Sequence, residues 1–156
     1  MTRADALQRA TDYFDSGELR QTLAHRVAFA TESQEPTQAP VMSAYLDEHM
    51  VPLLESLGFV CQIWPNPVAG GPPFLFAERT EPGAPFAVLS YGHGDVVRGY
   101  AAQWNAGLEP WTMVVDGDRW YGRGTADNKG QHSINLGALQ QVLAVRGGQL
   151  GYSFKL

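Results

Sequence analysis

The spacing of the apolar residues changes at Gly58, and this change constrains the fold more than any other feature of the sequence. Before Gly58, apolar side chains recur every three to four residues, as on one face of a helix. After Gly58 they fall into short runs bounded by proline, glycine and asparagine, which is typical of β-strands. A further helical stripe follows near the end of the chain. The order of these patterns predicts an α/β fold in which helices pack on a sheet.

Two helical stripes precede Gly58. The first runs from Ala4 to Ala30 and is interrupted at Asp15-Ser16-Gly17, which predicts two helices or one bent helix. The second ends at Gly58. Pro52 lies within it and predicts a kink, because proline has no N–H to donate to the preceding turn.

Three strands are predicted over residues 59–64, 73–77 and 85–91. The third is almost continuously apolar, which is typical of a strand covered by helices on both faces. We therefore predict a mixed sheet with helices on both faces.

The remaining elements are a hairpin, a long helix and a last strand. Asp116-Gly117-Asp118 separates two short strands and indicates the hairpin. A helix is expected from Asp127 to Arg146, with Ile134 and Leu139 among its inward residues and two glycines as its stop. Residues 150–156 are then predicted to form a strand.

Composition limits the function. The chain has 156 residues, of which 44% are hydrophobic and 17% charged, so it can bury a sizeable core. Its sixteen acidic and eleven basic side chains give a net charge of −5, which argues against binding to nucleic acid. Cys61, the single cysteine, cannot form an internal disulfide. The sequence shows neither a signal peptide nor an apolar run of the ~18 residues that a membrane span needs, so we expect a cytoplasmic protein without a membrane partner.

His93 and Asp95 stand directly after the most apolar predicted strand. In α/β sheets, ligands bind at the carboxyl ends of the strands. Residues two apart in an extended segment project to the same side, so the two side chains could share a pocket. Imidazole is a good ligand for zinc, and a neighbouring carboxylate can fix its tautomer. We therefore interpret the pair as a metal ligand with its orienting group.

Asp127 follows a glycine-rich turn at the start of the predicted helix. Its carboxylate could point into the same crevice and bridge two cations about 3.5–4 Å apart, the geometry of two-metal hydrolases. Other interpretations stay open at this point. Asp127 could be only a helix N-cap, and His93 a structural histidine. Lys129 is expected to be solvated or paired with a carboxylate, and His132 to face solvent.

Two segments together, residues 91–97 and 116–130, with Trp104 and Trp111 between them, closely resemble metallopeptidase family twenty. This family includes aminoacylases, glutamate carboxypeptidases, carnosinase-type dipeptidases and acetylornithine deacetylases. The resemblance implies a zinc-peptidase-like catalytic domain, of which residues 1–156 would be the N-terminal part. On this resemblance we expect these residues not to include the family's lid or dimerisation domain.

The resemblance assigns a role to each residue. It makes His93 a metal ligand, Asp95 the catalytic carboxylate that orients it, and Asp127 the aspartate that bridges two metal ions. It also implies a cis peptide bond between Asp127 and Asn128. The cofactors would be two divalent ions, zinc first, with cobalt or manganese as alternatives. The reaction would be hydrolysis of an amide bond in a small peptide or N-acyl amino acid. The resemblance also allows a homodimer of the full-length protein.

One departure from the family pattern limits the expected activity. The family has a Glu-Glu pair about thirty-five residues after the bridging aspartate, which supplies the general base and a ligand, and this sequence has no glutamate there. Since a zinc site wants about four ligands, we expect an incomplete site and an inactive isolated chain. The alternative is a non-catalytic binding or regulatory remnant of the same fold. A third hypothesis, a nucleotide-binding domain, rests only on the glycines at 122 and 124, without the third glycine of the fingerprint.

Overall fold

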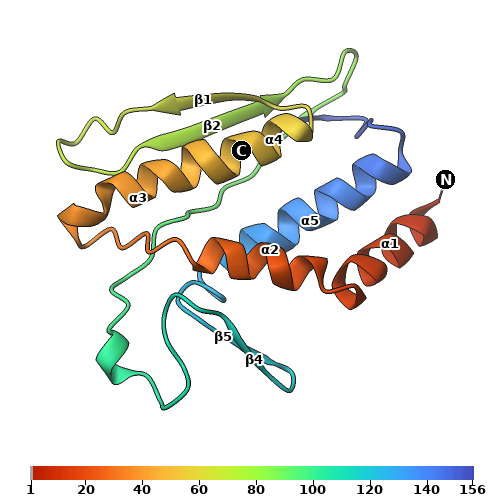
Figure 1. Cartoon of the computed structure of the whole chain (residues 1–156). Coiled ribbons are helices and arrows are strands. Elements are labelled where there is room, and N and C mark those ends of the chain that lie inside the picture. Colours follow the sequence, from red (N-terminus) through yellow and green to blue (C-terminus); the bar gives the residue numbers. More distant parts are fainter. Residues whose placement is uncertain (1) are drawn as a thin grey trace.

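The computed structural model describes residues 2–156 and contains helices, a four-stranded mixed sheet and a separate hairpin (Figure 1). The helical segments are α1 (Arg3–Asp15), α2 (Glu18–Val27), η1 (Pro36–Gln38), α3 (Ala39–Ala44), η2 (Tyr45–Met50), α4 (Val51–Ser56), η3 (Ala101–Gln103) and α5 (Lys129–Val145). The strands are β1 (Val60–Trp64), β2 (Phe74–Arg79), β3 (Ala87–Leu89), β4 (Val114–Asp116), β5 (Arg119–Tyr121) and β6 (Ser153–Lys155).

The helical stripes before Gly58 form helices as predicted. The first stripe gives α1 and α2, separated at Gly17, whose φ of 82° lies in the left-handed region that glycine adopts without strain. The second gives one continuous helical run from α3 through η2 to α4. The disturbance expected at Pro52 takes the form of a π turn, η2, that directly precedes it, with the N–H of Val51 donating to the carbonyl of Leu46.

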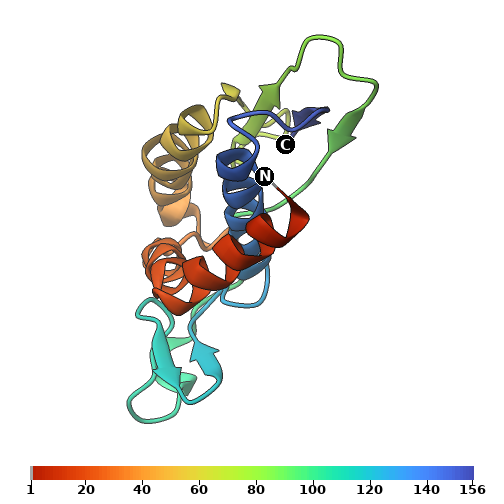
Figure 2. The same cartoon turned by 90° about the vertical axis from the view of Figure 1, so that its right-hand side faces the viewer.

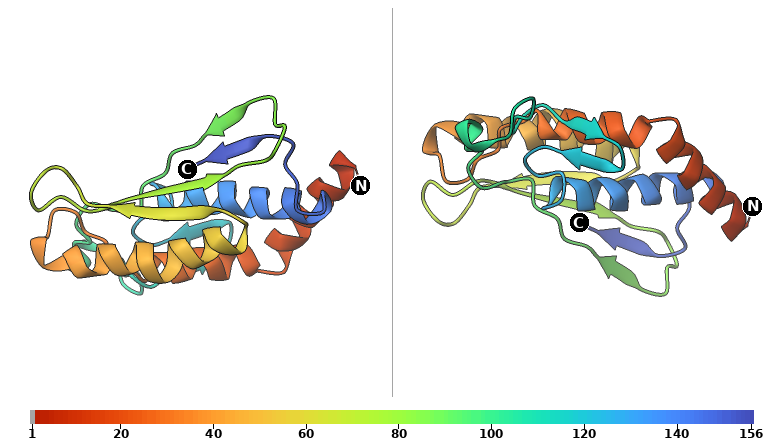
Figure 3. Two further views of the ribbon diagram at one scale, coloured as in Figure 1. Left: turned by 90° about the horizontal axis from the view of Figure 1, so that it is seen from above. Right: turned by 90° about the horizontal axis from the view of Figure 1, so that it is seen from below.

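The sheet has the strand order β1-β2-β6-β3. The β1/β2 and β2/β6 pairs are antiparallel and the β3/β6 pair is parallel, so the predicted mixed sheet is confirmed (Figure 3). The predicted hairpin is confirmed as well, because β4 pairs with β5 across the turn at Gly117. The last predicted strand is β6, which lies between β2 and β3.

Helices lie on only one face of this sheet among residues 2–156. Figure 2 shows α4 and α5 on the same side of the strands. The other face is open, and apolar side chains such as Val60, Trp64 and Phe86 are exposed on the strands or beside them. The expectation of a third strand covered on both faces is therefore wrong for this part of the chain. β3 is an edge strand with β6 as its neighbour, and its Leu89 is 77% exposed.

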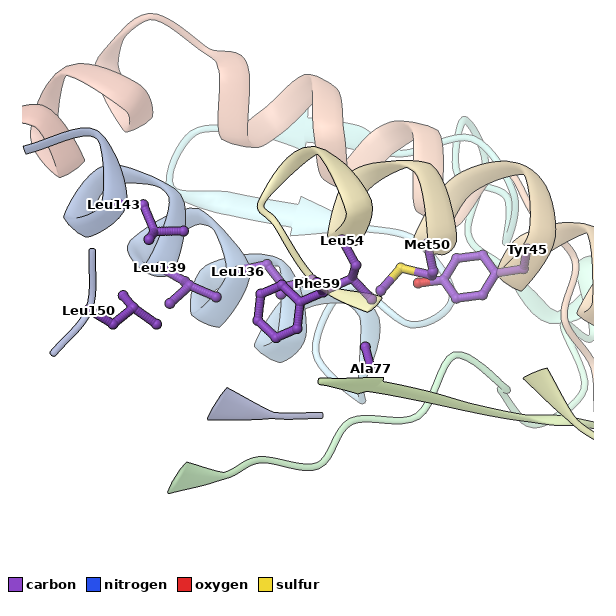
Figure 4. Close-up of a cluster of buried hydrophobic side chains, with 9 residues drawn as sticks. All are labelled: Tyr45, Met50, Leu54, Phe59, Ala77, Leu136, Leu139, Leu143 and Leu150. Carbon is purple, nitrogen blue, oxygen red and sulfur yellow. The ribbon is translucent and has the colours of Figure 1, made fainter. Parts of the chain in front are cut away.

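The hydrophobic core lies between α4, α5 and the covered face of the sheet (Figure 4). Its buried members are Tyr45, Met50, Leu54, Phe59, Ala77, Leu136, Leu139, Leu143 and Leu150. Leu139 is inward as predicted, but Ile134 is 59% exposed. The reason is that α5 also packs against α1 and α2, and this second contact turns the polar residues at its start inward. The core thus fixes α5 and places its N-terminal end near the segment that follows β3.

Candidate metal centre

The segment after β3 is held by hydrogen bonds to Thr31, which lies shortly after α2. The hydroxyl of Thr31, which is buried, donates to the carbonyl of Gly94 at 2.5 Å. The N–H of Val96 donates to the carbonyl of Thr31 at 2.9 Å. Gly94 lies against the ring of Tyr45, so closely that a Cβ there would come within 2.2 Å of a ring carbon. These contacts fix the backbone directly after His93.

The structure brings His93, Asp95 and Asp127 together, as the sequence predicted. The Nδ1 atom of His93 lies 3.1 Å from Oδ1 of Asp95 and 3.0 Å from its carbonyl oxygen. The Nε2 atom lies 3.1 Å from Oδ1 of Asp127. His93 and Asp95 are partly exposed, whereas the carboxylate of Asp127 is 80% exposed. The three side chains therefore form an accessible cluster across two distant parts of the sequence.

The arrangement around the His93 ring suits a cation. When Nδ1–H donates to Asp95, the Nε2 lone pair faces a carboxylate oxygen, and two electron-rich atoms at 3.1 Å repel each other unless a proton or a cation lies between them. Two ligands that share a zinc ion at its usual bond lengths are about 3.3 Å apart, so the observed separation fits this use. Nε2 of His93 and the carboxylate of Asp127 are the groups that could hold the metal.

Asp127 precedes α5 and does not cap it. The N-cap of α5 is Asn128, and the peptide bond between Asp127 and Asn128 is cis, as the family resemblance implied. The interpretation of Asp127 as only an N-cap is therefore wrong. The turn before it is compact, because Gly124 has a φ of 90° and its carbonyl accepts the N–H of Gly130 at 3.1 Å.

A buried polar cluster lies directly beneath this site, between α2, η2 and α5. Its members are Arg26, Tyr45, His49, Lys129, His132 and Ser133. Sequence reasoning missed this cluster and placed two of its residues wrongly. Lys129, expected to be solvated or paired with a carboxylate, is fully buried and donates to a backbone carbonyl. His132, expected to face solvent, is 6% exposed. They turn inward because the first turn of α5 packs between α2 and the π turn η2.

The two basic side chains of the cluster, Lys129 and Arg26, donate hydrogen bonds to neutral partners. The ammonium of Lys129 donates to the carbonyl of Phe29 at 2.7 Å and lies 5.3 Å from the centre of the Tyr45 ring. Burial lowers the pKa of Lys129 to about 7, and the negative charge of Asp95 opposes that shift. The guanidinium of Arg26 donates to His49 at 3.0 Å and to Ser133 at 2.5 Å, and burial lowers its pKa.

Burial also keeps the two histidines of the cluster neutral near pH 7. It lowers the pKa of His132 to about 3 and that of His49 to about 4, and the charge of Arg26 adds to both shifts. The pKa of Tyr45 is raised because its hydroxyl is buried. At neutral pH, both imidazoles and the phenol can therefore act as neutral hydrogen-bonding groups.

A cavity of about 250 Å³ opens beside the His93 segment. Met42, Met50 and Leu75 contribute apolar walls, and His93 and Asp95 lie at its polar side. Within residues 2–156, however, no group of three or more histidine, cysteine, aspartate or glutamate side chains is placed to hold a metal ion. The described part of the chain thus supplies two candidate ligands, His93 and Asp127, and a carboxylate, Asp95, in contact with the first of them. None of its helices is long and apolar enough to cross a membrane.

The model of peptidase family M20/M25/M40 matches residues 89–153, the stretch that contains His93, Asp95 and Asp127. Over these residues the chain is similar to the M20 family. Peptidases of the M20 family are generally metal-dependent, which agrees with the chemistry of the His93–Asp127 pair.

Solved structures share the M20-type fold. Human carnosine dipeptidase 1 superposes with a TM-score of 0.83 at 23% identity, over 97% of this chain and 33% of that one. The Saccharomyces cerevisiae di-peptidase Dug1p gives 0.80 at 16% identity, again over 97% and 33%. The M20 metallo-carboxypeptidase Sso-CP2 from Sulfolobus solfataricus gives 0.65 at 24% identity, over 89% and 30%. The chain spans about a third of the length of these structures, and the α/β class predicted from the sequence is confirmed.

Proposed function

We propose that this chain is the N-terminal part of the catalytic domain of a dinuclear metal-dependent amide hydrolase and supplies His93 and Asp127 as ligands. The observation that carries the proposal is that the His93 ring contacts a carboxylate at each nitrogen. Nδ1 lies 3.1 Å from Asp95, and Nε2 lies 3.1 Å from Asp127. In this scheme Asp95 would fix the tautomer of His93, and His93 and Asp127 would help to hold two divalent ions, for which zinc is our first candidate. When bound, the metal would polarise the scissile carbonyl and lower the pKa of a water molecule.

For the substrate, we propose the amide bond of a small peptide, with a dipeptide as the first choice and an N-acyl amino acid as the second. The support is the fold shared with human carnosine dipeptidase 1 and the di-peptidase Dug1p, together with the M20 match over the site residues. His93 and Asp127 alone give fewer than the three protein ligands usual at a catalytic zinc. We therefore expect residues 2–156 to bind metal weakly and to hydrolyse no dipeptide without further ligands.

Metal binding tests this proposal directly. We expect cobalt, titrated against a competing chromophoric chelator, to bind the chain, and His93→Ala to lower its affinity about tenfold or more because it removes a ligand. Asp95→Asn should lower it about tenfold, since the amide no longer holds Nδ1–H as strongly.

His25→Ala is the matched control, because His25 is exposed on α2 and is outside the proposed site. Equal cobalt affinities for the wild type, His93→Ala and Asp95→Asn would contradict the proposal. Chelator-sensitive turnover of a dipeptide by the isolated chain would contradict the expected inactivity.

A further inference from the structure

A line of hydrogen-bonding side chains runs from the π turn η2 to the backbone of His93. The hydroxyl of Tyr45 lies 2.6 Å from Nε2 of His132. Nδ1 of His132 lies 3.4 Å from Oδ1 of Asn128, and the same oxygen accepts the backbone N–H of His93 at 3.1 Å. Three segments that are far apart in the sequence, η2, the start of α5 and the loop after β3, are thus connected through side chains.

The donors and acceptors along this line admit one consistent assignment. Oδ1 of Asn128 can only accept, and its partner amide nitrogen donates to Gln131, which fixes the orientation of the amide. The hydrogen of the neutral His132 ring therefore belongs on Nδ1, where it points to Asn128. Nε2 of His132 is then an acceptor, and the hydroxyl of Tyr45 donates to it.

Tyr45 and His132 are well placed to hold this line rigid. Tyr45 is 2% exposed and His132 6%, and their rings lie side by side with centroids 6.2 Å apart. The ring of Tyr45 also touches Gly94, the residue after His93, and a Cβ at Gly92 would come within 3.1 Å of His132. Tyr45 and His132 thus lie against the loop on either side of His93, at Gly94 and Gly92 respectively.

We propose that Tyr45 and His132 are positioning residues that act through Asn128 to aim Nε2 of His93 at Asp127. The inference rests on the proposed function, in which His93 is a metal ligand. The two residues would contribute to metal affinity although they lie behind the ligand. The proposal also assigns His132 a single tautomer, with its hydrogen on Nδ1.

A pair of variants at His132 separates positioning from packing. His132→Leu keeps the bulk of the side chain and removes the donor, whereas His132→Asn places an amide N–H near the position of Nδ1. We expect His132→Leu to lower the cobalt affinity about tenfold and to speed hydrogen exchange of the His93 amide by a similar factor. His132→Asn should restore most of the cobalt affinity and most of the protection of the His93 amide. His25→Leu, at an exposed position, should change neither quantity.

Nitrogen-15 spectra of the His132 ring give a readout that does not depend on metal. We expect a protonated Nδ1 in the wild type, and a loss of this tautomer preference in Tyr45→Phe, which keeps the ring but removes the hydroxyl donor. Tyr45→Phe also serves if His132→Leu does not fold.

Three results would overturn the inference: a hydrogen on Nε2 of His132 in the wild type, an unchanged tautomer in Tyr45→Phe, or full cobalt affinity and unchanged His93 exchange in a folded His132→Leu. If the wild type binds no cobalt, the proposed function fails. The tautomer and the exchange of the His93 amide then still decide whether Tyr45 and His132 position the loop.

Discussion

Substitution of Gly130 by alanine is expected to destabilise the protein by about 3 kcal/mol or more and to weaken metal binding. A Cβ at Gly130 would lie 1.8 Å from the carbonyl oxygen of Thr125 and 2.9 Å from its carbonyl carbon. Both are backbone atoms, so no side-chain rotation relieves the clash. The first turn of α5 and the turn before it must move apart, and Asp127 lies between them. Urea unfolding and cobalt titration of Gly130→Ala measure the two effects.

Gly137→Ala is the matched control on the same helix. Its Cβ would meet the ring of Tyr13 at 2.8 Å, a side chain that can shift, and alanine in a helix gains about 1 kcal/mol over glycine. We expect its free energy of unfolding to stay within about 1 kcal/mol of the wild type. If the two variants unfold at the same urea concentration, the close approach of Gly130 to Thr125 does not limit stability.

The features that the sequence predicted correctly depend on local patterns. Helical periodicity and the break at Gly17 gave α1 and α2, and a three-residue turn gave the hairpin. The position of His93 and Asp95 after a strand predicted the contact between their side chains, because residues two apart in an extended segment project to the same side. The approach of Asp127 depends on the return of the chain through the β4/β5 hairpin to the start of α5. The glycine-rich turn left this approach open as one interpretation, and the family resemblance favoured it.

The features that the sequence did not predict depend on contacts between distant segments. Lys129 and His132 are polar, and nothing in their neighbours shows that α2 and η2 enclose the first turn of α5. The apolar run around Leu89 indicated a strand but not its place at the edge of the sheet. The link from Tyr45 to His132 spans 87 positions, so no local pattern could reveal it. Composition alone places lysine and histidine at the surface, and here tertiary packing overrides that preference.

The same buried histidines make the fold sensitive to acid. Burial lowers the pKa of His132 to about 3 and that of His49 to about 4, whereas an unfolded histidine titrates near 6.5. Between these values the unfolded chain binds more protons than the folded one, so the free energy of unfolding falls as the pH falls. The contribution of these two histidines to the free energy of unfolding is complete above pH 6.5. It is lost progressively as the pH falls below 6.5 and through 4 and 3. For His132 alone the loss between pH 7 and pH 4 is about 3 kcal/mol.

Urea unfolding of the wild type and His132→Asn at pH 7, 5.5 and 4 isolates this effect, because the carboxylates that titrate in the same range are common to both proteins. The groups whose charges act on His132 are Arg26, Lys129, His93 and His49, and the substitution leaves all four in place. His132→Asn removes the titrating ring, so its stability should fall by about 3 kcal/mol less than that of the wild type over this range. Parallel pH profiles for the wild type and His132→Asn would mean that His132 is protonated in the folded protein. Such protonation would put a hydrogen on both ring nitrogens and end the acceptor role of Nε2 toward Tyr45.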